Sequence, residues 1–532
     1  MQKVAFGIMG FKKLDLNDIQ QILEDRFVND TFFSLKDLPH PFLLKDAKKG
    51  AEIVADAVCN NKKILIVGDY DVDGVMASIV MMKFFEIIQY QKVSFVIPNR
   101  FFDGYGVSPQ LIEKNETDLI ITVDNGVTAI DAGQFCLEKN IKLIITDHHV
   151  PSDVLPSCDA LINPQQKDCS FPQKNICGAA VAWYFCNALK IILNKKVSLR
   201  GLLKFVALAS IADMMPLTHI NKLFVREGLE QLRDSEELSD LLLKSLFKAK
   251  KFNSQDVSFN IIPLLNSAGR INDASIVCDF FLKKEEKEIE KIFLTLKDLN
   301  KQRKKLTQQT FEESHDCLKQ NDHCVVAYKK EWSDGVIGIV ATRLVDLYHK
   351  AAFVFTYKGD GIIKGSGRSD GKINLFETLL PYQDCFIHFG GHAEAVGISL
   401  KETDLENFLQ IFKEPLFILT DEHTEQHQEI LGYLDIRDIN ARLFNLIHQF
   451  EPYGQGNPMP HFIIQGARVL RVSVLKSQHQ KIEFEGGIYG IEFFSKEFFK
   501  EGDCLNFQCV LQENLFDTKP NLIIKDVSLC HL

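Results

Sequence analysis

The chain has thirteen cysteines, but no two of them have CxxC spacing. The closest pairs, such as Cys504 with Cys509, lack the spacing of a zinc or redox motif. A long apolar run is also missing, because VAFGIMGF is too short for a secretory signal and VMASIVMMKFFEII is interrupted by Lys83 and Glu86. These absences predict a soluble, cytoplasmic protein with reduced thiols and no membrane association.

An excess of positive charge is absent as well, since the formal net charge is −10. Binding to nucleic acid without regard to sequence depends on many Lys and Arg side chains near phosphates, so this charge argues against a protein that coats polyanions. A local basic groove is still compatible with it, because the carboxylates of a metal site inflate the negative count. With 46% hydrophobic and 25% charged residues, the 532-residue chain is globular, and its length predicts three or four domains.

Between about residues 50 and 215, apolar β-type runs alternate with amphipathic helical stretches. The runs are KILIVG, KVSFVI, DLIITV and KLIIT. Such alternation predicts an α/β fold with a parallel, doubly wound sheet. Binding sites in these sheets lie beyond the carboxyl ends of the strands.

The rest of the chain changes pattern twice. Residues 216–282 are predicted to be mostly helical, and Lys283 to Leu318 is a charged stretch without Gly or Pro that predicts one long connecting helix. A second, smaller α/β unit is expected from Cys324. From about Glu429, short alternating strands predict a small antiparallel barrel.

Four acidic or histidine motifs interrupt the apolar pattern, and we expect them at the ends of buried strands. They are DYDVDG (Asp69 to Gly74), VDNG (Val123 to Gly126), DHH (Asp147 to His149) and IAD (Ile211 to Asp213). In the first motif, strand alternation would place all three carboxylates on one side. Their mutual repulsion requires a compensating cation, so together the motifs predict a two-metal phosphoesterase.

Each motif also has a structural explanation. Acidic residues often cap helices, although a cap needs one Asp and not three. Asn-Gly after Asp124 is a strong turn signal, and Asp213 could form a salt bridge in its apolar segment. Two adjacent histidines after an acid are harder to explain structurally, because imidazole is a common neutral metal ligand. The combination of all four motifs favours the metal site.

This order of motifs resembles the DHH phosphoesterase superfamily, and most closely its RecJ-type single-strand-specific exonucleases. The resemblance covers residues 50–400 and rests on GDYDVDG, PNRFFDGYG, TVDNG, TDHHVP, GAAVAWY, ASIADMMPL, LLNSAGRIND, GVIGIVATRL, KGSGRS and FGGHAEAVG. It implies a lead segment (1–50), a DHH catalytic domain (51–215), a helical region with the connecting helix (216–322), a DHHA1-type domain (323–425) and an oligonucleotide-binding (OB) barrel (426–532).

The resemblance also implies roles for the motif residues. The ligands of two Mn²⁺ or Mg²⁺ ions would be Asp71, Asp73, Asp124, His148 and Asp213. Asp124 would be the bridging ligand. His149 would contact phosphate or act as an acid or base, and Asp69 and Asp147 would be outer acids that orient the ligands.

Substrate contacts are implied for Arg100, Tyr105, Arg270, Ser366, Arg368 and His392. Arginine forks and backbone amides of small residues suit a phosphate. GGHAEAVG has the pattern of a helix start, with His392 beside backbone that can approach a ligand closely. The structural alternatives are salt bridges for the arginines, a tight turn at GSGRS, and a glycine-rich turn with a buried histidine at GGHAEAVG. Ser333 stands where the family usually has a histidine, which puts a substrate role for that side chain in doubt.

The implied function is a 5′→3′ exonuclease that degrades 5′-phosphorylated single-stranded DNA to mononucleotides in DNA repair and recombination, beside a helicase and a single-strand-binding protein. Two alternatives stay open: a phosphodiesterase of short oligonucleotides or cyclic dinucleotides, and a non-catalytic single-strand-binding relative. The first would not need the region after Glu429. The second conflicts with the retention of all four metal motifs.

Overall fold

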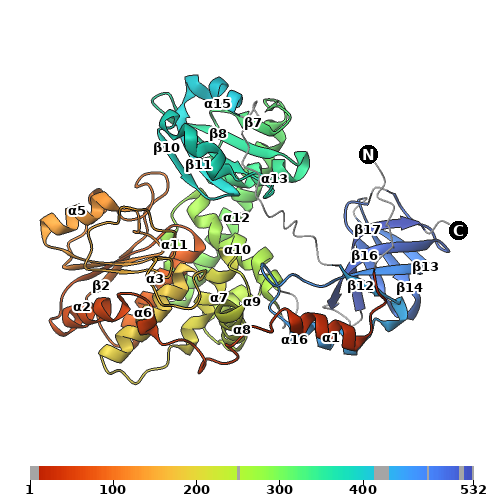
Figure 1. Cartoon of the computed structure of the whole chain (residues 1–532), viewed down its shortest axis with the longest axis horizontal. Coiled ribbons are helices and arrows are strands. Elements are labelled where there is room, and N and C mark those ends of the chain that lie inside the picture. Colours follow the sequence, from red (N-terminus) through yellow and green to blue (C-terminus); the bar gives the residue numbers. More distant parts are fainter. Residues whose placement is uncertain are drawn as a thin grey trace. The chain divides into compact units, whose positions relative to one another are not determined.

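The computed structural model describes residues 11–247, 252–411, 430–475, 478–495, 497–513 and 520–529. The chain forms two compact units, whose elements are labelled in Figure 1. The first contains Met1–Pro98, Asp103–Ile262 and Gln426–Leu532, and the second contains Asn99–Phe102 and Pro263–Glu425. Within the described residues, no helix is both long and apolar enough to cross a membrane.

A five-stranded parallel sheet forms the centre of the first unit. Its strands are β1 (Ile64–Val67), β2 (Val93–Val96), β3 (Leu119–Val123), β4 (Lys142–Thr146) and β5 (Ala160–Ile162), in the order β2-β1-β3-β4-β5. All neighbouring strands are parallel, which confirms the predicted doubly wound sheet. The order reverses between β1 and β3, and ligands bind at such a switch point.

Helices pack on both faces of this sheet. One apolar cluster joins β1, β3 and β4 to α4 (Pro109–Glu113) and α5 (Ile130–Lys139). The α3 helix (Val72–Ile87) and the α6 helix (Gly178–Ile192) contact each other and the strands, together with α2 (Ala47–Cys59). Almost every α3 residue up to Met81 is buried, which explains why its sequence has no polar face.

The first unit continues with helices, as predicted for residues 216–282. These are α8 (His219–Asp234), α9 (Leu238–Lys244) and α10 (Ser254–Ile271), the last of which runs on into the second unit. Helix α7 (Leu203–Ala212) precedes them and was not predicted. The α7 helix packs against both α3 and α8. It therefore connects the sheet to the helical region.

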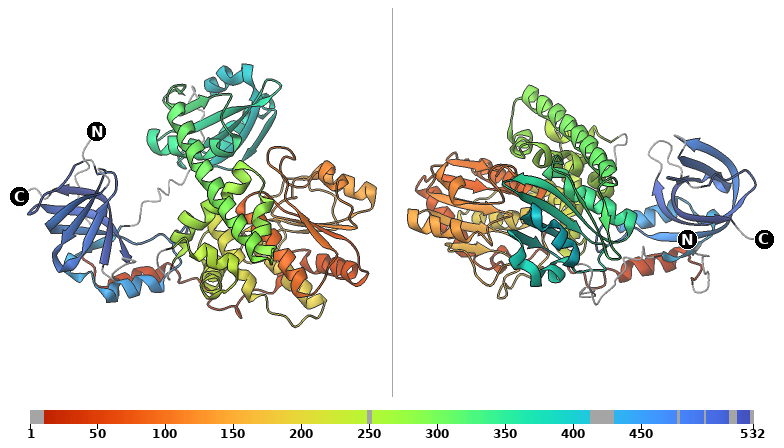
Figure 2. Two further views of the ribbon diagram at one scale, coloured as in Figure 1. Left: turned by 180° about the vertical axis from the view of Figure 1, so that it is seen from behind. Right: turned by 90° about the horizontal axis from the view of Figure 1, so that it is seen from above.

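The carboxyl-terminal part of the first unit is a closed barrel, seen in blue in the right panel of Figure 2. Its strands are β13 (His461–Leu475), β14 (His479–Phe484), β15 (Tyr489–Glu492), β16 (Cys504–Glu513) and β17 (Pro520–Leu529), preceded by β12 (Ile430–Leu434) and α16 (Ala441–Gln449). Pairing of β13 with β16 closes it. The β12–β13 and β15–β17 pairs are parallel, so the barrel is not wholly antiparallel.

The amino-terminal segment packs into the barrel core. Helix α1 (Leu16–Asp25) contributes Ile19 and Leu23 to the apolar cluster that contains the barrel strands and α16. Just before it, Leu14 N donates to Tyr433 O at 3.0 Å. Residues at the two ends of the sequence thus share one core.

The second unit contains the smaller α/β domain. Helices α11 (Ser275–Leu282) and α12 (Glu286–Ser314) precede a six-stranded sheet in the order β10-β11-β9-β8-β7-β6. Its strands are β6 (Lys319–Gln320), β7 (Cys324–Tyr328), β8 (Ala351–Gly359), β9 (Ile362–Arg368), β10 (His388–Gly391) and β11 (Ala395–Lys401), with helices α13 (Asp334–Tyr348), α14 (Leu375–Leu379) and α15 (Leu405–Ile411). The long α12 confirms the predicted long helix, but it lies wholly within the second unit, and the helix that runs from the first unit into the second is α10.

Candidate active site

The DYDVDG motif lies at the switch point, in the turn from β1 to α3. Strand β1 ends at Val67, so strand alternation does not align the three carboxylates as expected. Asp71 is instead the N-cap of α3, where it accepts from Gly74 N at 3.1 Å, and Asp73 is in the first helical turn. Asp69 lies before them and is 3% exposed. The helix start, and not the pleat, brings these acids together.

Asp124 follows β3 at the other side of the switch point. Its φ of 63° turns the chain sharply, a conformation that Asp adopts more readily than most residues. The Oδ1 atom is buried without a hydrogen bond in the described structure and lies 3.1 Å from His148 Nε2. A buried carboxylate oxygen in this state needs a cation nearby.

The DHH motif follows β4, as predicted. His148 Nε2 lies 3.6 Å from Asp73 Oδ2 and 3.7 Å from Asp213 Oδ2. Asp147 accepts from Val127 N at 2.9 Å, and its Oδ1 lies 2.7 Å from His149 Nδ1. His148 therefore points into the acidic site, whereas Asp147 fixes the ring of His149.

IAD is the one motif that does not follow a strand of the parallel sheet. Asp213 is the C-cap of α7, so the expectation that all four motifs end strands is wrong for IAD. A helix with nine buried residues has no polar face from which to read its type, which explains the error. The packing of α7 on α3 still places Asp213 near His148.

Four separate segments therefore converge on one carboxylate cluster, which we define as Asp69, Asp71, Asp73, Asp124, His148 and Asp213. Possible ligand atoms within 4.8 Å of one another form three overlapping groups: Asp69, Asp71 and Asp124; Asp73, His148 and Asp213; and Asp124, His148 and His149. Carboxylate oxygens with imidazole nitrogen suit Mn²⁺ or Mg²⁺. The overlap at Asp124 is compatible with a bridging ligand.

Burial and like charge dominate the electrostatics of this cluster. Burial, followed by repulsion from Asp71, raises the pKa of Asp73 to about 7. Burial, followed by repulsion from Asp73 and Asp71, raises the pKa of Asp213 to about 8. Burial also raises the pKa of Asp124, with Asp73 as the next cause. Bound cations would reverse this preference for the neutral forms.

His149 has the opposite environment. Burial disfavours its charged form, but the hydrogen bond to Asp147 prevails and raises the pKa of His149 to about 9. The same bond lowers the pKa of Asp147 although burial opposes it. The pair can keep a proton on the imidazole near neutral pH, at the edge of the carboxylate cluster.

Backbone groups that we did not predict complete the cluster. The first residues of α6 donate to Asp73, from Gly178 N at 2.6 Å and from Ala179 N at 2.7 Å. A Cβ on Gly178 would lie 2.5 Å from Asp124 Oδ1. The small residues that open GAAVAWY were the available signal, because only glycine permits this approach.

Tyr105 lies beside the cluster in the same unit. Its ring is edge-on to His149 at 6.5 Å and edge-on to Tyr70 at 6.1 Å. The side chain is 51% exposed. Tyr105 is thus a ring next to the acidic site that is open to solvent, as a base-contacting residue requires.

In the second unit, an arginine cluster consists of Arg100, Ser366 and Arg368. Arg368 Nη1 donates to Ser366 Oγ at 2.9 Å and to Gly367 O at 2.7 Å. Burial, and next the charge of Arg100, lowers the pKa of Arg368. Arg368 Nη2 would lie 3.1 Å from a Cβ on Gly338, so α13 also approaches closely. Two guanidiniums near each other indicate an anion site.

The other predicted substrate contacts in this unit are Arg270 and His392, which lie outside the arginine cluster. Arg270 Nη1 donates to Gly335 O at 3.3 Å, and its backbone packs on Gly335. His392 is exposed in the turn between β10 and β11, so the helix start expected at GGHAEAVG is wrong. The glycines there make a hairpin. Ser333 is the N-cap of α13 and forms no side-chain capping bond.

Three family models match the chain. They are the DHH family N-terminal domain (residues 63–210), the DHHA1 domain (321–416) and the RecJ OB domain (430–526). The single-stranded-DNA-specific exonuclease RecJ of Escherichia coli is 31% identical over 477 residues, 83% of this chain and 81% of that protein. The chain belongs to the RecJ family.

Other RecJ comparisons agree. The Bacillus subtilis single-stranded-DNA-specific exonuclease RecJ is 34% identical over 81% of this chain, which spans 55% of that longer protein. RecJ from Thermus thermophilus, solved in complex with Mn²⁺, superposes with a TM-score of 0.75 at 24% identity, over 92% of this chain and 72% of that one. An exonuclease RecJ bound to manganese gives 0.60 at 27% identity, over 70% and 94%. The predicted family and fold class are confirmed.

Proposed function

We propose that this RecJ-family chain is a metal-dependent exonuclease that degrades single-stranded DNA from its 5′ end to mononucleotides. The observation that carries the proposal is the carboxylate cluster, in which four distant segments surround a buried carboxylate oxygen that accepts no hydrogen bond from any residue that the structure describes. RecJ relatives named single-stranded-DNA-specific exonucleases support the substrate. The barrel supports a long strand over a dinucleotide, because OB barrels bind oligonucleotides.

The carboxylate cluster would hold two Mn²⁺ or Mg²⁺ ions through Asp71, Asp73, Asp124, His148 and Asp213. Such a pair acidifies a water and stabilises the departing oxygen of a phosphodiester. The chain's part is to fix the ligands: α6 amides orient Asp73, and Asp69 reinforces the charge beside Asp71. Gly178 leaves room for Asp124 to turn toward both groups of ligand atoms.

His149 and Asp147 would act next to the cluster. The 2.7 Å hydrogen bond fixes the ring of His149 and favours its protonated form. A protonated imidazole can donate to a phosphate oxygen or to the departing oxygen. Tyr105 would stack on a base of the strand, because its ring is exposed beside His149.

The arginine cluster would hold the 5′-phosphate. Arg368 uses one guanidinium nitrogen for Ser366 and Gly367, which leaves further N–H groups to donate to an anion. Arg100 adds a second positive charge. Arg270 and His392 would contact other phosphates of the strand. Action beside a helicase and a single-strand-binding protein, in the cytoplasm, stays a prediction from family resemblance.

The decisive experiment is digestion of 5′- and 3′-labelled single strands, duplexes and dinucleotides with Mn²⁺. We expect stepwise shortening of single strands from the 5′ end and faster cleavage of phosphorylated ends. Degradation from the 3′ end would contradict the polarity. Turnover of dinucleotides with no turnover of long strands would favour the short-oligonucleotide phosphodiesterase, and binding without cleavage would favour a non-catalytic relative.

A further inference from the structure

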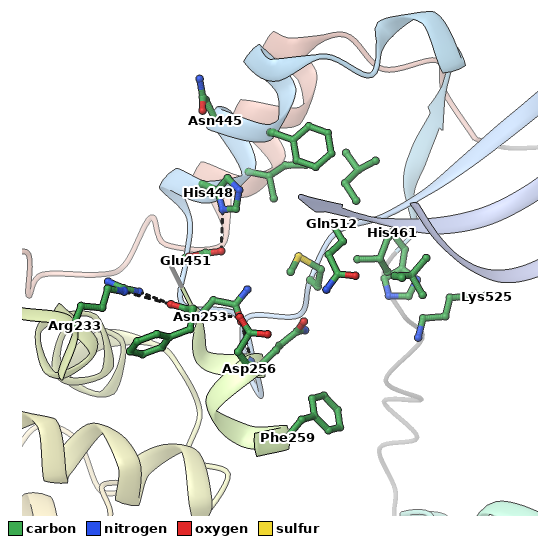
Figure 3. Close-up of a pocket in the computed structure, with 18 residues that line it drawn as sticks. Arg233, Asn253, Asp256, Phe259, Asn445, His448, Glu451, His461, Gln512 and Lys525 are labelled. Carbon is green, nitrogen blue, oxygen red and sulfur yellow. Dashed lines mark hydrogen bonds and ion pairs between the residues drawn. The ribbon is translucent and has the colours of Figure 1, made fainter. Parts of the chain in front are cut away.

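A cavity of about 570 Å³ lies within the first unit, where α10 and α16 meet the outer side of the barrel (Figure 3). Its volume is within the range of about 300–1,000 Å³ found for small-molecule sites. Two hydrogen bonds connect the helical region to the segment between α16 and β13: Ser254 Oγ donates to Tyr453 O at 2.6 Å, and Leu217 N donates to Gln455 O at 2.7 Å. None of its lining residues belongs to the carboxylate cluster.

An aromatic ring stands at the rim of this cavity. Phe259 on α10 is 78% exposed, and Figure 3 shows its ring directed away from its helix beside the open space. Because the ring of Phe259 is exposed, its contribution to the stability of the fold through hydrophobic burial is small. The ring does offer a flat face for stacking.

Side-chain amides line the walls. Gln255 on α10 and Gln512 on β16 line the cavity, and their side chains form no hydrogen bonds with the residues that the structure describes. An amide both donates and accepts, so it can pair with the edge of any nucleobase. Lys525 on β17 adds a positive charge with no ion pair among the described residues.

The other charged groups of the lining are already engaged. His448 Nδ1 lies 2.9 Å from Glu451 Oε1, and Asp256 forms a capping box with Asn253. Arg233 donates to Phe252 O at 2.9 Å. We therefore assign to a ligand the ring of Phe259, the amides of Gln255 and Gln512 and the positive charge of Lys525.

A peptide strand does not fit this wall well. The barrel strands that form it, β13, β16 and β17, are each paired on both edges. Addition of a further strand needs a free edge. A nucleotide, by contrast, supplies a flat face, a polar edge and an anion in one molecule.

We propose that this cavity holds a nucleobase of the single-stranded DNA, with its ring against Phe259, its edge toward the amides and its phosphate near Lys525. The site would be a second contact with the strand, separate from the metal ligands. The site would bind all four bases with similar affinity, because an amide can donate to and accept from the edge of any base. This inference rests on the proposed function for the identity of the ligand.

The test measures binding of full-length protein in EDTA, without cleavage, to two 3′-labelled 20-mers: one with bases and one with the same phosphates but abasic sugars. Phe259→Ala should raise the Kd for the base-containing strand roughly fivefold or more, since stacking of one base contributes about 1–3 kcal/mol. The Kd for the abasic strand should not change. Phe494→Ala, which removes an exposed ring outside the cavity, is the matched control.

Phe259→Trp should retain the tight binding, which separates stacking from a folding defect. Equal weakening on both strands, or no weakening by Phe259→Ala, would overturn the proposal and leave the cavity to another kind of partner. Digestion of the base-containing strand by the wild-type protein with Mn²⁺ is run in parallel. Failure of that digestion counts against the exonuclease, whereas loss of base-dependent binding on substitution of Phe259 still identifies the cavity.

Discussion

The carboxylate cluster of the first unit and the arginine cluster of the second both bring like charges together, but with opposite signs and different supports. The carboxylates are held by backbone amides and one imidazole, and among the described residues none donates a hydrogen bond to Asp124 Oδ1. In the arginine cluster, Arg368 is held by a hydroxyl and a carbonyl. With its carboxylates ionised, the first arrangement is stabilised by bound cations, while the second keeps guanidinium donors available for an anion.

The two clusters therefore contribute to different steps of the reaction. Loss of a carboxylate should affect the chemical step itself. Loss of an arginine should affect which strand end is held.

The largest expected effect is that of Asp124→Ala. Because Asp124 connects two groups of ligand atoms, its loss should lower Mn²⁺-dependent cleavage about a thousandfold or more, equivalent to about 4 kcal/mol of barrier. Affinity for single strands in EDTA should be retained. Asp153→Ala, at a fully exposed acid, is the control. Cleavage that survives Asp124→Ala would show that the ligand assignment is wrong.

Removal of metal should change the pH dependence of stability. A carboxyl whose pKa is raised on folding stabilises the fold below its unfolded pKa of 3.8, and this contribution is lost as pH rises toward the folded value. For Asp73 and Asp213 the loss should therefore extend from about pH 4 to about 7 and 8. Thermal unfolding in EDTA should show a falling Tm over that window.

Mn²⁺ should oppose this fall, because a ligand at a hundredfold excess over its Kd adds about 2.7 kcal/mol to stability. The rise in Tm on adding Mn²⁺ should be greater at pH 8 than at pH 5, and much smaller in Asp73→Asn. An equal rise at both pH values in the wild type would contradict the pKa assignments.

Arg368→Ala should have an intermediate effect. Hydrogen bonds to charged groups contribute about 1.5–3 kcal/mol, so the KM for 5′-phosphorylated strands should rise roughly tenfold or more while kcat changes little. Strands with a 5′-hydroxyl should be affected much less. Arg437→Ala, at an exposed arginine paired with Asp435, is the control. Equal loss on both kinds of end would exclude a 5′-phosphate site.

The smallest effect is expected for Ser333→Ala. Ser333 caps α13 by position only, without a side-chain hydrogen bond, so its replacement should alter the free energy of unfolding by less than about 0.5 kcal/mol. Cleavage of single strands should not change. A clear loss of activity would show that the residue at the family's usual histidine position contacts the substrate even as serine.

The parallel sheet, the long helix α12, the barrel region and the DHH motif at the end of β4 were all predictable from the amino-acid pattern. Buried strands and charged helices have periodicities that follow from local geometry, so they can be read without a structure. The family motifs further predicted which acids belong together.

How those acids meet could not be predicted and depends on the packing of the folded chain. Asp213 reaches the cluster from the end of helix α7, the turn into α3 aligns Asp71 and Asp73, and the amino-terminal segment joins the barrel core. The hairpin at His392 and the cavity at Phe259 were equally invisible in the sequence. These features depend on packing between segments far apart in the chain, and local propensity carries no information about that packing.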